Sequence, residues 1–204
     1  MKLVIIHIGK CAGSVVCNTL RKNNIEFTEI HVQKAKFKEN KKYVILLRNP
    51  ISRFISAFNW RYELVLIDKT QKNRFYKEKN VLKKYNNVNN LAENIENYDV
   101  GEEYIHHIYE DINYYLSDFL KECKSENILG VITQENLYDD FKKIFNINID
   151  ENVKSRKNNS GMSKDISDTG YKLLKKYLWR DYECIEKLYK MGCLTEIQYT
   201  KLSK

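Results

Sequence analysis

The sequence predicts an α/β domain in which a central parallel sheet lies between layers of helices. Apolar runs of strand length occupy residues 2–8, 42–48 and 127–133. Their nearly continuous hydrophobicity is typical of parallel strands that are buried on both faces. Segments with helical periodicity separate these runs, and strands that alternate with helices favour a three-layer arrangement.

Composition limits the class of protein. At 204 residues, without a linker or an internal repeat, the chain predicts a single domain over residues 1–204. The net charge of +8 favours an anionic partner, but no motif interleaves aromatic with basic residues, so we expect no nucleic acid. Five cysteines without a CxxC pair argue against both a disulfide framework and a zinc site. No apolar run reaches the length of a membrane span or a signal peptide, and we expect a cytoplasmic protein of undetermined oligomeric state.

The elements follow in order along the chain. A helix is expected over residues 13–23, an alternating second strand over 26–32, and another helix from Pro50, the only proline, with Asn49 as N-cap. Residues 68–124 form a polar, helical insertion. Its apolar stripe at helical spacing consists of Ile105, Ile108, Ile112, Leu116 and Phe119.

After the strand at 127–133, the sequence predicts a short helix, a loop and a long helix. A short helix is expected over residues 134–145, and a basic loop without periodicity over 153–167. A long helix then runs over 169–191, begins after Ser167 or Asp168, and ends at Gly192.

The stretch "HIGKCAGS", residues 7–14, places Lys10 where the first strand turns into a helix. The first N–H groups of a helix have no backbone partner and lie at the positive end of its dipole, so this loop predicts an anion site. It is not a Walker A loop, because the required earlier glycine would fall on Val4 and Cys11 replaces the magnesium-binding hydroxyl.

A second candidate anion site follows the third strand. Arg48 ends that strand, and Ser56 lies two turns into the next helix. A guanidinium and a hydroxyl can share one phosphate. On spacing alone, an exposed helix face beside a strand-end arginine explains the pattern better.

Together these elements resemble sulfotransferases that use 3′-phosphoadenosine-5′-phosphosulfate (PAPS), in particular the carbohydrate-directed branch. "HIGKCAGSV" resembles the family's H-I-P-K-T-G-G-T-S loop, and "RNPISRFISAF" closely matches its R-[DN]-P-x-x-R-F-x-S-x-[YF] motif. "VITQENLYDDFKKIF", "RKNNSGMS" and "YLWRDYECIEKL" are similar to later parts of that family. The resemblance implies a P-loop-like fold, with Gly9 and Cys11 as departures from the family loop.

The same resemblance implies which residues bind the nucleotide. The first motif and its flanks would hold the 5′-phosphosulfate, the second motif the 3′-phosphate, and a late basic loop would close the pocket. The expected PAPS-binding residues are Lys10, Cys11, Ala12, Gly13, Ser14, Val15, Arg48, Arg53, Ser56, Arg156, Asn159 and Ser160.

Sulfuryl transfer requires a cation at the departing phosphate oxygen and a base for the acceptor proton. Lys10 is the expected cation. Glu29 and His31 share one face of the second strand. Glu29 is the favoured base with His31 as its partner, and the reverse assignment is the alternative. His106 and His107 are expected to contact the acceptor. We expect no metal, because spacing indicates no third ligand near these histidines.

The sequence therefore predicts a PAPS-dependent sulfotransferase acting on a hydroxyl or amine of a glycan or small molecule, with the insertion at 68–124 binding the acceptor. Two alternatives remain. One is a nucleotide kinase-like phosphoryl transferase, which would require magnesium. The other is a degenerate relative that binds nucleotide without turnover, which the departures at Gly9 and Cys11 allow.

Overall fold

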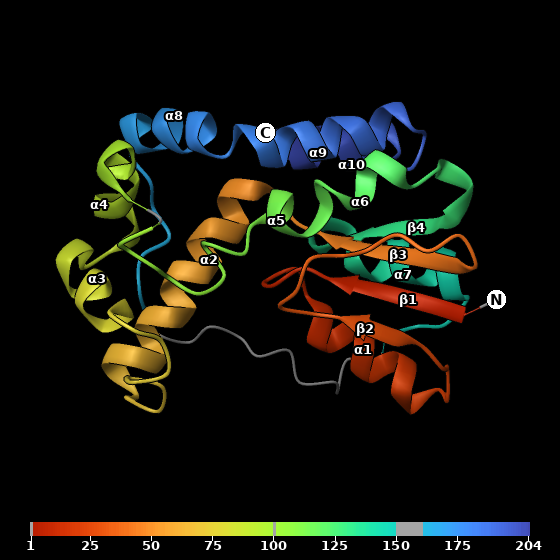
Figure 1. Cartoon of the computed structure of the whole chain (residues 1–204), viewed down its shortest axis with the longest axis horizontal. Coiled ribbons are helices and arrows are strands. Elements are labelled where there is room, and N and C mark those ends of the chain that lie inside the picture. The colour runs from red at the N-terminus through yellow and green to blue at the C-terminus, as the bar shows by residue number, and fades with distance from the viewer. Residues whose placement is uncertain (1, 100, 150–160) are drawn as a thin grey trace. The chain divides into compact units, whose positions relative to one another are not determined.

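The computed structural model describes residues 2–99, 101–149 and 161–204 and confirms the α/β class. Its four strands form one all-parallel sheet in the order β2-β1-β3-β4 (Figure 1). The strands are β1 (Lys2–His7), β2 (Thr28–Ile30), β3 (Lys41–Leu47) and β4 (Ile128–Thr133).

The two central strands explain why the sheet forms. Consecutive residues of β1 and β3 are buried, from Val4 to His7 and from Tyr43 to Leu47, so both faces of the sheet are covered. The strands pair in parallel, with His7 opposite Leu46. Their carboxyl ends therefore lie next to each other, and so do the two loops that follow them.

The chain divides into two compact units, and the sheet belongs to the first. Unit 1 comprises residues 1–49, 111–157 and 181–204. Its helices are α1 (Gly13–Lys22), α5 (Ile112–Leu116), α6 (Phe119–Glu122), α7 (Leu137–Phe145), all but the first two residues of α9 (Trp179–Lys190), and α10 (Glu196–Ser203). Short 3-10 turns at Ser125–Asn127 and Gln134–Asn136 flank β4.

Unit 2 is helical and comprises residues 50–110 and 158–180. It contains α2 (Pro50–Tyr62), which continues as a π-helix (Glu63–Ile67), then α3 (Glu78–Tyr85), α4 (Val88–Glu93), a 3-10 turn (Ile95–Asn97) and α8 (Asp168–Tyr177). Helix α2 packs against α3, α4 and α8 through buried apolar side chains (Figure 1).

The structure corrects several expected boundaries. The second strand is shorter than residues 26–32, and Val32 just beyond it has a left-handed backbone with φ 59°. The stripe from Ile105 to Phe119 is buried, but it is not one helix. A left-handed backbone at His107 (φ 68°) and an N-cap at Asp111, which accepts from the N–H of Tyr114, separate its parts.

The C-terminal region also differs from the expectation of one long helix. Residues 168–190 form two helices, α8 and α9, which are separated at Leu178. The predicted ends are confirmed: Ser167 caps α8 by accepting from the N–H of Gly170, and Gly192 has φ 73°. Helix α10 was not predicted, although Thr195 and Gln198 form a capping box at its start.

Among residues 2–99, 101–149 and 161–204, no helix is both long enough and apolar enough to cross a lipid bilayer.

Candidate functional site

The loop between β1 and α1 is a tight, left-handed turn. Lys10 has φ 71° and Ala12 has φ 61°, whereas Cys11 between them keeps a negative φ. The N–H of Cys11 donates to the carbonyl of Ile8 over 3.3 Å. Backbones that alternate in this way form concave groups of N–H donors that suit anions. No side chain caps the first turn of α1, which begins at Gly13.

Arg48 connects this loop to the end of β3. Its Nη1 donates to the backbone carbonyl of Lys10 over 3.4 Å, and both side chains are half-buried. The contact follows from the pairing of β1 with β3, which places the two strand ends side by side. The structure thus brings Arg48, the first residue of the second motif, to the loop of the first motif, although Lys10 and Arg48 are 38 residues apart in the chain.

Gly13 allows the start of α1 to pack directly on the ring of His7. A Cβ atom at this position would lie 1.8 Å from Cδ2 and 2.0 Å from Nε2 of that ring. Any side chain here would therefore displace the imidazole or the helix. The glycine of the first motif is therefore needed for this close approach.

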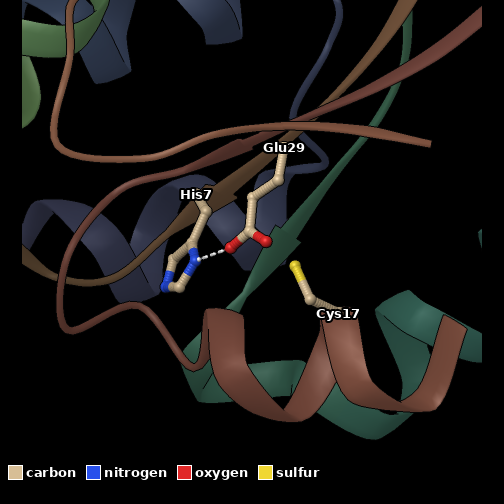
Figure 2. Close-up of side chains that lie close together, drawn as sticks. All are labelled: His7, Cys17 and Glu29. Carbon is tan, nitrogen blue, oxygen red and sulfur yellow. Dashed lines mark hydrogen bonds and ion pairs between the residues drawn. The ribbon is translucent and has the colours of Figure 1, made fainter. Parts of the chain in front are cut away.

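Glu29 is held by two basic side chains of unit 1. Nδ1 of His7 lies 2.6 Å from Oε1 of Glu29 (Figure 2). Nη2 of Arg21 donates to Oε2 of the same carboxylate over 2.6 Å. Burial favours a higher pKa for Glu29, but the hydrogen bonds from His7 and Arg21 outweigh it and lower this pKa. Burial and the neighbouring His31 lower the pKa of His7. The resting state is a carboxylate beside a neutral imidazole.

His31 follows β2 and stacks on His7, with ring centroids 4.0 Å apart and planes 14° apart. Its Nδ1 lies 2.8 Å from the backbone oxygen of His7. A carbonyl oxygen only accepts, so Nδ1 carries the proton and Nε2 carries the lone pair. The two candidate bases are therefore brought into one cluster, with His7 between them. Sequence reasoning missed His7 and Arg21.

The thiol of Cys17 completes this cluster from the first turns of α1. Donor atoms of His7, Cys17 and Glu29 all lie within 4.8 Å of one another (Figure 2). Burial, followed by the charge and hydrogen bond of Glu29, raises the pKa of the Cys17 thiol to about 12. The thiol is therefore protonated at neutral pH and is a poor nucleophile.

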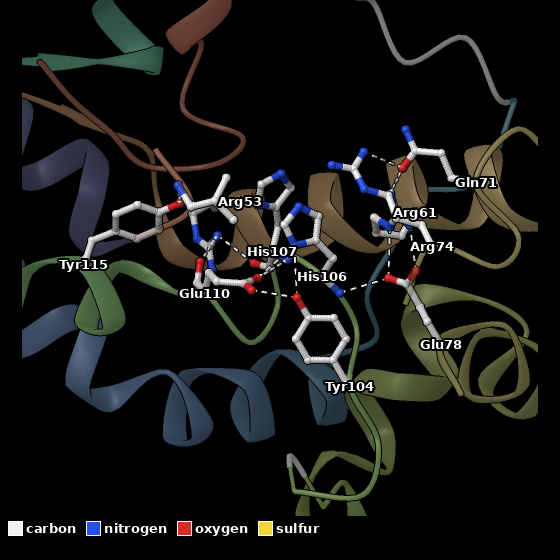
Figure 3. Close-up of polar contacts among 11 residues, drawn as sticks. Arg53, Arg61, Gln71, Arg74, Glu78, Tyr104, His106, His107, Glu110 and Tyr115 are labelled. Atoms are coloured by element: carbon white, nitrogen blue, oxygen red, sulfur yellow. Dashed lines mark hydrogen bonds and ion pairs between the residues drawn. The ribbon is translucent and has the colours of Figure 1, made fainter. Parts of the chain in front are cut away.

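His106 and His107 belong to a buried network in unit 2. Their rings stack with centroids 3.9 Å apart, and each residue is only 4% exposed. Nδ1 of His106 lies 3.1 Å from Oε2 of Glu110 and 3.1 Å from the hydroxyl of Tyr104 (Figure 3). The N–H of His107 donates to the same Oε2 over 2.7 Å. Contact of these histidines with an acceptor stays a prediction.

Glu110 is the centre of that network. Burial favours a higher pKa for its carboxyl, but hydrogen bonds from His106, Tyr104 and the N–H of His107 outweigh burial and lower the pKa to about 2. Donor atoms of His106, His107 and Glu110 lie within 4.8 Å of one another. The fold thus supplies a third possible metal ligand, four residues after His106, that spacing had not indicated.

A buried ion pair adjoins the histidines. Nε and Nη2 of Arg61 donate to the two carboxylate oxygens of Glu78 over 2.9 and 2.6 Å, and both side chains are fully buried (Figure 3). Oε1 of Glu78 also accepts from the N–H of His106 over 2.9 Å. This pair fixes the start of α3 to α2 and to the histidine segment.

The other predicted nucleotide contacts are distributed over both units of the chain. Arg53 is fully buried in unit 2, where Nη1 donates to the carbonyls of His107 and Glu110. Ser56 is half-buried in α2 of the same unit. Arg156, Asn159 and Ser160 lie outside the described residues. Cys11 and Val15 are buried, Ala12 is half-buried and Ser14 is exposed.

No family model, no curated protein and no solved structure matches this chain. The interpretation of the site therefore depends on its own residues and their geometry.

Proposed function

We propose that the protein is a PAPS-dependent sulfotransferase with a P-loop-like, three-layer sheet domain. The observation that carries this proposal is the contact between Arg48 and the backbone of Lys10. It places the arginine that would bind the 3′-phosphate beside the loop that would bind the phosphosulfate. The pairing of β1 with β3 brings the two strand ends together, and the lysine and arginine that they carry suit opposite ends of one adenosine bisphosphate.

The first loop has the chemistry needed for the phosphosulfate. Its alternating backbone and the uncapped start of α1 offer N–H donors to an anion. As sulfuryl transfer proceeds, negative charge grows on the departing phosphate oxygen, and Lys10 supplies a cation at this loop. The guanidinium group of Arg48 would bind the 3′-phosphate through bidentate hydrogen bonds.

The contacts of the two candidate bases favour His31 as the group that takes the acceptor proton. Glu29 already accepts hydrogen bonds from His7 and Arg21, which lower its pKa and weaken it as a base. His31 directs its Nδ1 proton to the backbone carbonyl of His7, so Nε2 is the ring nitrogen that would face the acceptor in this proposal. Glu29 would act through His7 to keep the stacked imidazoles in place.

The acceptor in this proposal is a hydroxyl or amine of a glycan or small molecule. A second candidate, nucleotide binding without turnover, is favoured by the orientation of Cys11. Its Sγ lies 3.8 Å from the carbonyl of Gly9 and is buried, so the thiol turns toward its own loop. This position would not supply the hydroxyl that the family loop directs at the phosphate.

The test is a calorimetric titration with 3′-phosphoadenosine-5′-phosphate (PAP) and, separately, with ATP in the presence and absence of magnesium. The proposal predicts that PAP binds more tightly than ATP and that magnesium does not improve PAP binding. Tighter binding of ATP with magnesium would overturn it in favour of a kinase-like enzyme. PAP binding without release of sulfate or sulfated product from PAPS would support the second candidate.

A further inference from the structure

We infer that His7, Cys17 and Glu29 form a binding site for a divalent transition metal of the zinc class. The inference does not rest on the proposed function. It rests on three different ligand types, one nitrogen, one sulfur and one oxygen, which converge within 4.8 Å (Figure 2).

Three separate elements of unit 1 position the ligands. His7 ends β1, Cys17 lies in α1, and Glu29 is the middle residue of β2. His7 is further fixed by Gly13 and by the stacked ring of His31. His7 and Cys17 are buried, whereas the side chain of Glu29 is 26% exposed, which gives an ion a route from solvent.

The ligand set fits zinc chemistry. Zinc binds histidine nitrogen, cysteine thiolate and carboxylate oxygen in tetrahedral geometry, and three protein ligands leave the fourth position to water. One thiolate and one carboxylate also neutralise the two positive charges of the ion. Because the three ligand atoms already lie within 4.8 Å of one another, small side-chain rotations would bring all three to one ion.

The second cluster, His106, His107 and Glu110, fits less well. It has a single anionic ligand and no sulfur, and Arg53 donates to the backbone carbonyl of Glu110 beside it. Both oxygens of Glu110 already accept hydrogen bonds, from Tyr104, His106 and the N–H of His107. Because this cluster offers one anionic ligand where the first cluster offers two, the inference is confined to the first cluster.

Metal binding requires two proton movements. The Cys17 thiol releases its proton to solvent as the sulfur–metal bond forms. Nδ1 of His7 now directs its proton to Glu29, so the neutral imidazole must move that proton to Nε2 before Nδ1 can bind the ion. Glu29 exchanges the His7 contact for the metal while Arg21 continues to donate to its other oxygen.

The experiment uses Co²⁺ alone as the probe, added to the full-length protein without nucleotide. A thiolate ligand gives a sulfur-to-cobalt charge-transfer band in the near ultraviolet, and tetrahedral cobalt gives strong visible bands. We expect one equivalent of Co²⁺ to bind with both signals, and Zn²⁺ to displace it. The Cys17→Ser protein should lose the charge-transfer band and bind at least about tenfold more weakly.

Cys184→Ser is the matched control, because Cys184 is also buried and its thiol pKa is likewise raised to about 12, mainly by burial. It should bind cobalt as the wild type does. Glu29→Gln, which keeps the side-chain shape, should weaken binding while the charge-transfer band remains at saturation. An unchanged band in Cys17→Ser, its loss in Cys184→Ser, or no cobalt binding by the folded wild type would overturn the inference. None of these results depends on PAP binding.

Discussion

Nη1 of Arg48 lies 3.4 Å from the backbone oxygen of Lys10, so the side chain that ends β3 contacts the loop that follows β1. This contact holds together two segments that each have the chemistry to bind a phosphate. In the proposed function the two residues have different roles. Lys10 would stabilise the leaving group, whereas Arg48 would combine its contact with the loop and a charged group for the other end of the nucleotide.

Lys10→Ala and Arg48→Ala should therefore have different effects. Loss of a preorganised cation at the leaving oxygen is expected to lower turnover of PAPS by about 10² to 10³ and to change PAP affinity much less. Loss of Arg48 is expected to weaken PAP binding by about 10-fold to 100-fold, since hydrogen bonds to charged groups contribute about 1.5 to 3 kcal/mol. PAP calorimetry together with release of PAP from PAPS measures both. Equal effects on both quantities would contradict the division.

Gly13→Ala should destabilise the protein, because its methyl group would overlap the ring of His7. Overpacking of this kind costs about 1 to 3 kcal/mol. Urea unfolding of the two proteins gives the difference. Gly101→Ala is the control, since a Cβ there meets only the Asp99 carboxylate oxygen at 3.2 Å. Equal stabilities of Gly13→Ala and wild type would show that the ring does not pack on the helix.

Acid should destabilise the fold partly through Glu110. The pKa of Glu110 is lowered from 4.5 to about 2 in the folded protein. Its contribution to the free energy of unfolding is therefore complete above the unfolded pKa of about 4.5 and is lost as pH falls from there toward 2. That difference corresponds to an upper value of about 3 kcal/mol. Denaturant unfolding at several pH values should show a shallower loss for Glu110→Gln than for wild type. Glu183→Gln, at an exposed site, is the control for loss of a carboxylate. If the stability of all three proteins fell with pH along parallel curves, the prediction would be wrong.

Glu78→Gln should be strongly destabilising, because it leaves the buried Arg61 guanidinium without its counter-charge. Breaking one partner of a buried pair costs about 3 to 5 kcal/mol. Replacing both residues with apolar ones, as Arg61→Met with Glu78→Leu, should recover much of that loss. Lys121→Met removes the exposed pair with Asp118 and should leave the thermal midpoint unchanged. A Glu78→Gln protein as stable as wild type would show that the pair is not buried in solution.

Much of the sheet could be predicted from the sequence. The strands β1, β3 and β4 are continuous apolar runs of strand length, and burial on both faces explains that pattern. The absence of one continuous helix through the apolar stripe from Ile105 to Phe119 could not be predicted in the same way. It depends on a left-handed backbone at His107, which a helical spacing of apolar residues does not reveal.

The candidate site was predictable only where its residues are close in sequence or follow strand ends. The loop with Lys10 and the strand-end Arg48 were found from motifs, and parallel pairing explains why they meet. The cluster of His7, Cys17 and Glu29 depends on the register that sets Ile5 opposite Glu29. Register between distant strands is decided by packing, so the part played by His7 was missed although it opens the first motif.

The most direct test compares the binding of PAP with that of adenosine 5′-phosphate, which lacks the 3′-phosphate, to wild type, Arg48→Ala and Lys10→Ala. If Arg48 binds the 3′-phosphate and the first loop binds the 5′-phosphate, wild type and Lys10→Ala will bind PAP more tightly than adenosine 5′-phosphate. Arg48→Ala will lose that preference. An undiminished preference for PAP in Arg48→Ala would contradict the central claim that the two adjoining strand ends bind one adenosine bisphosphate.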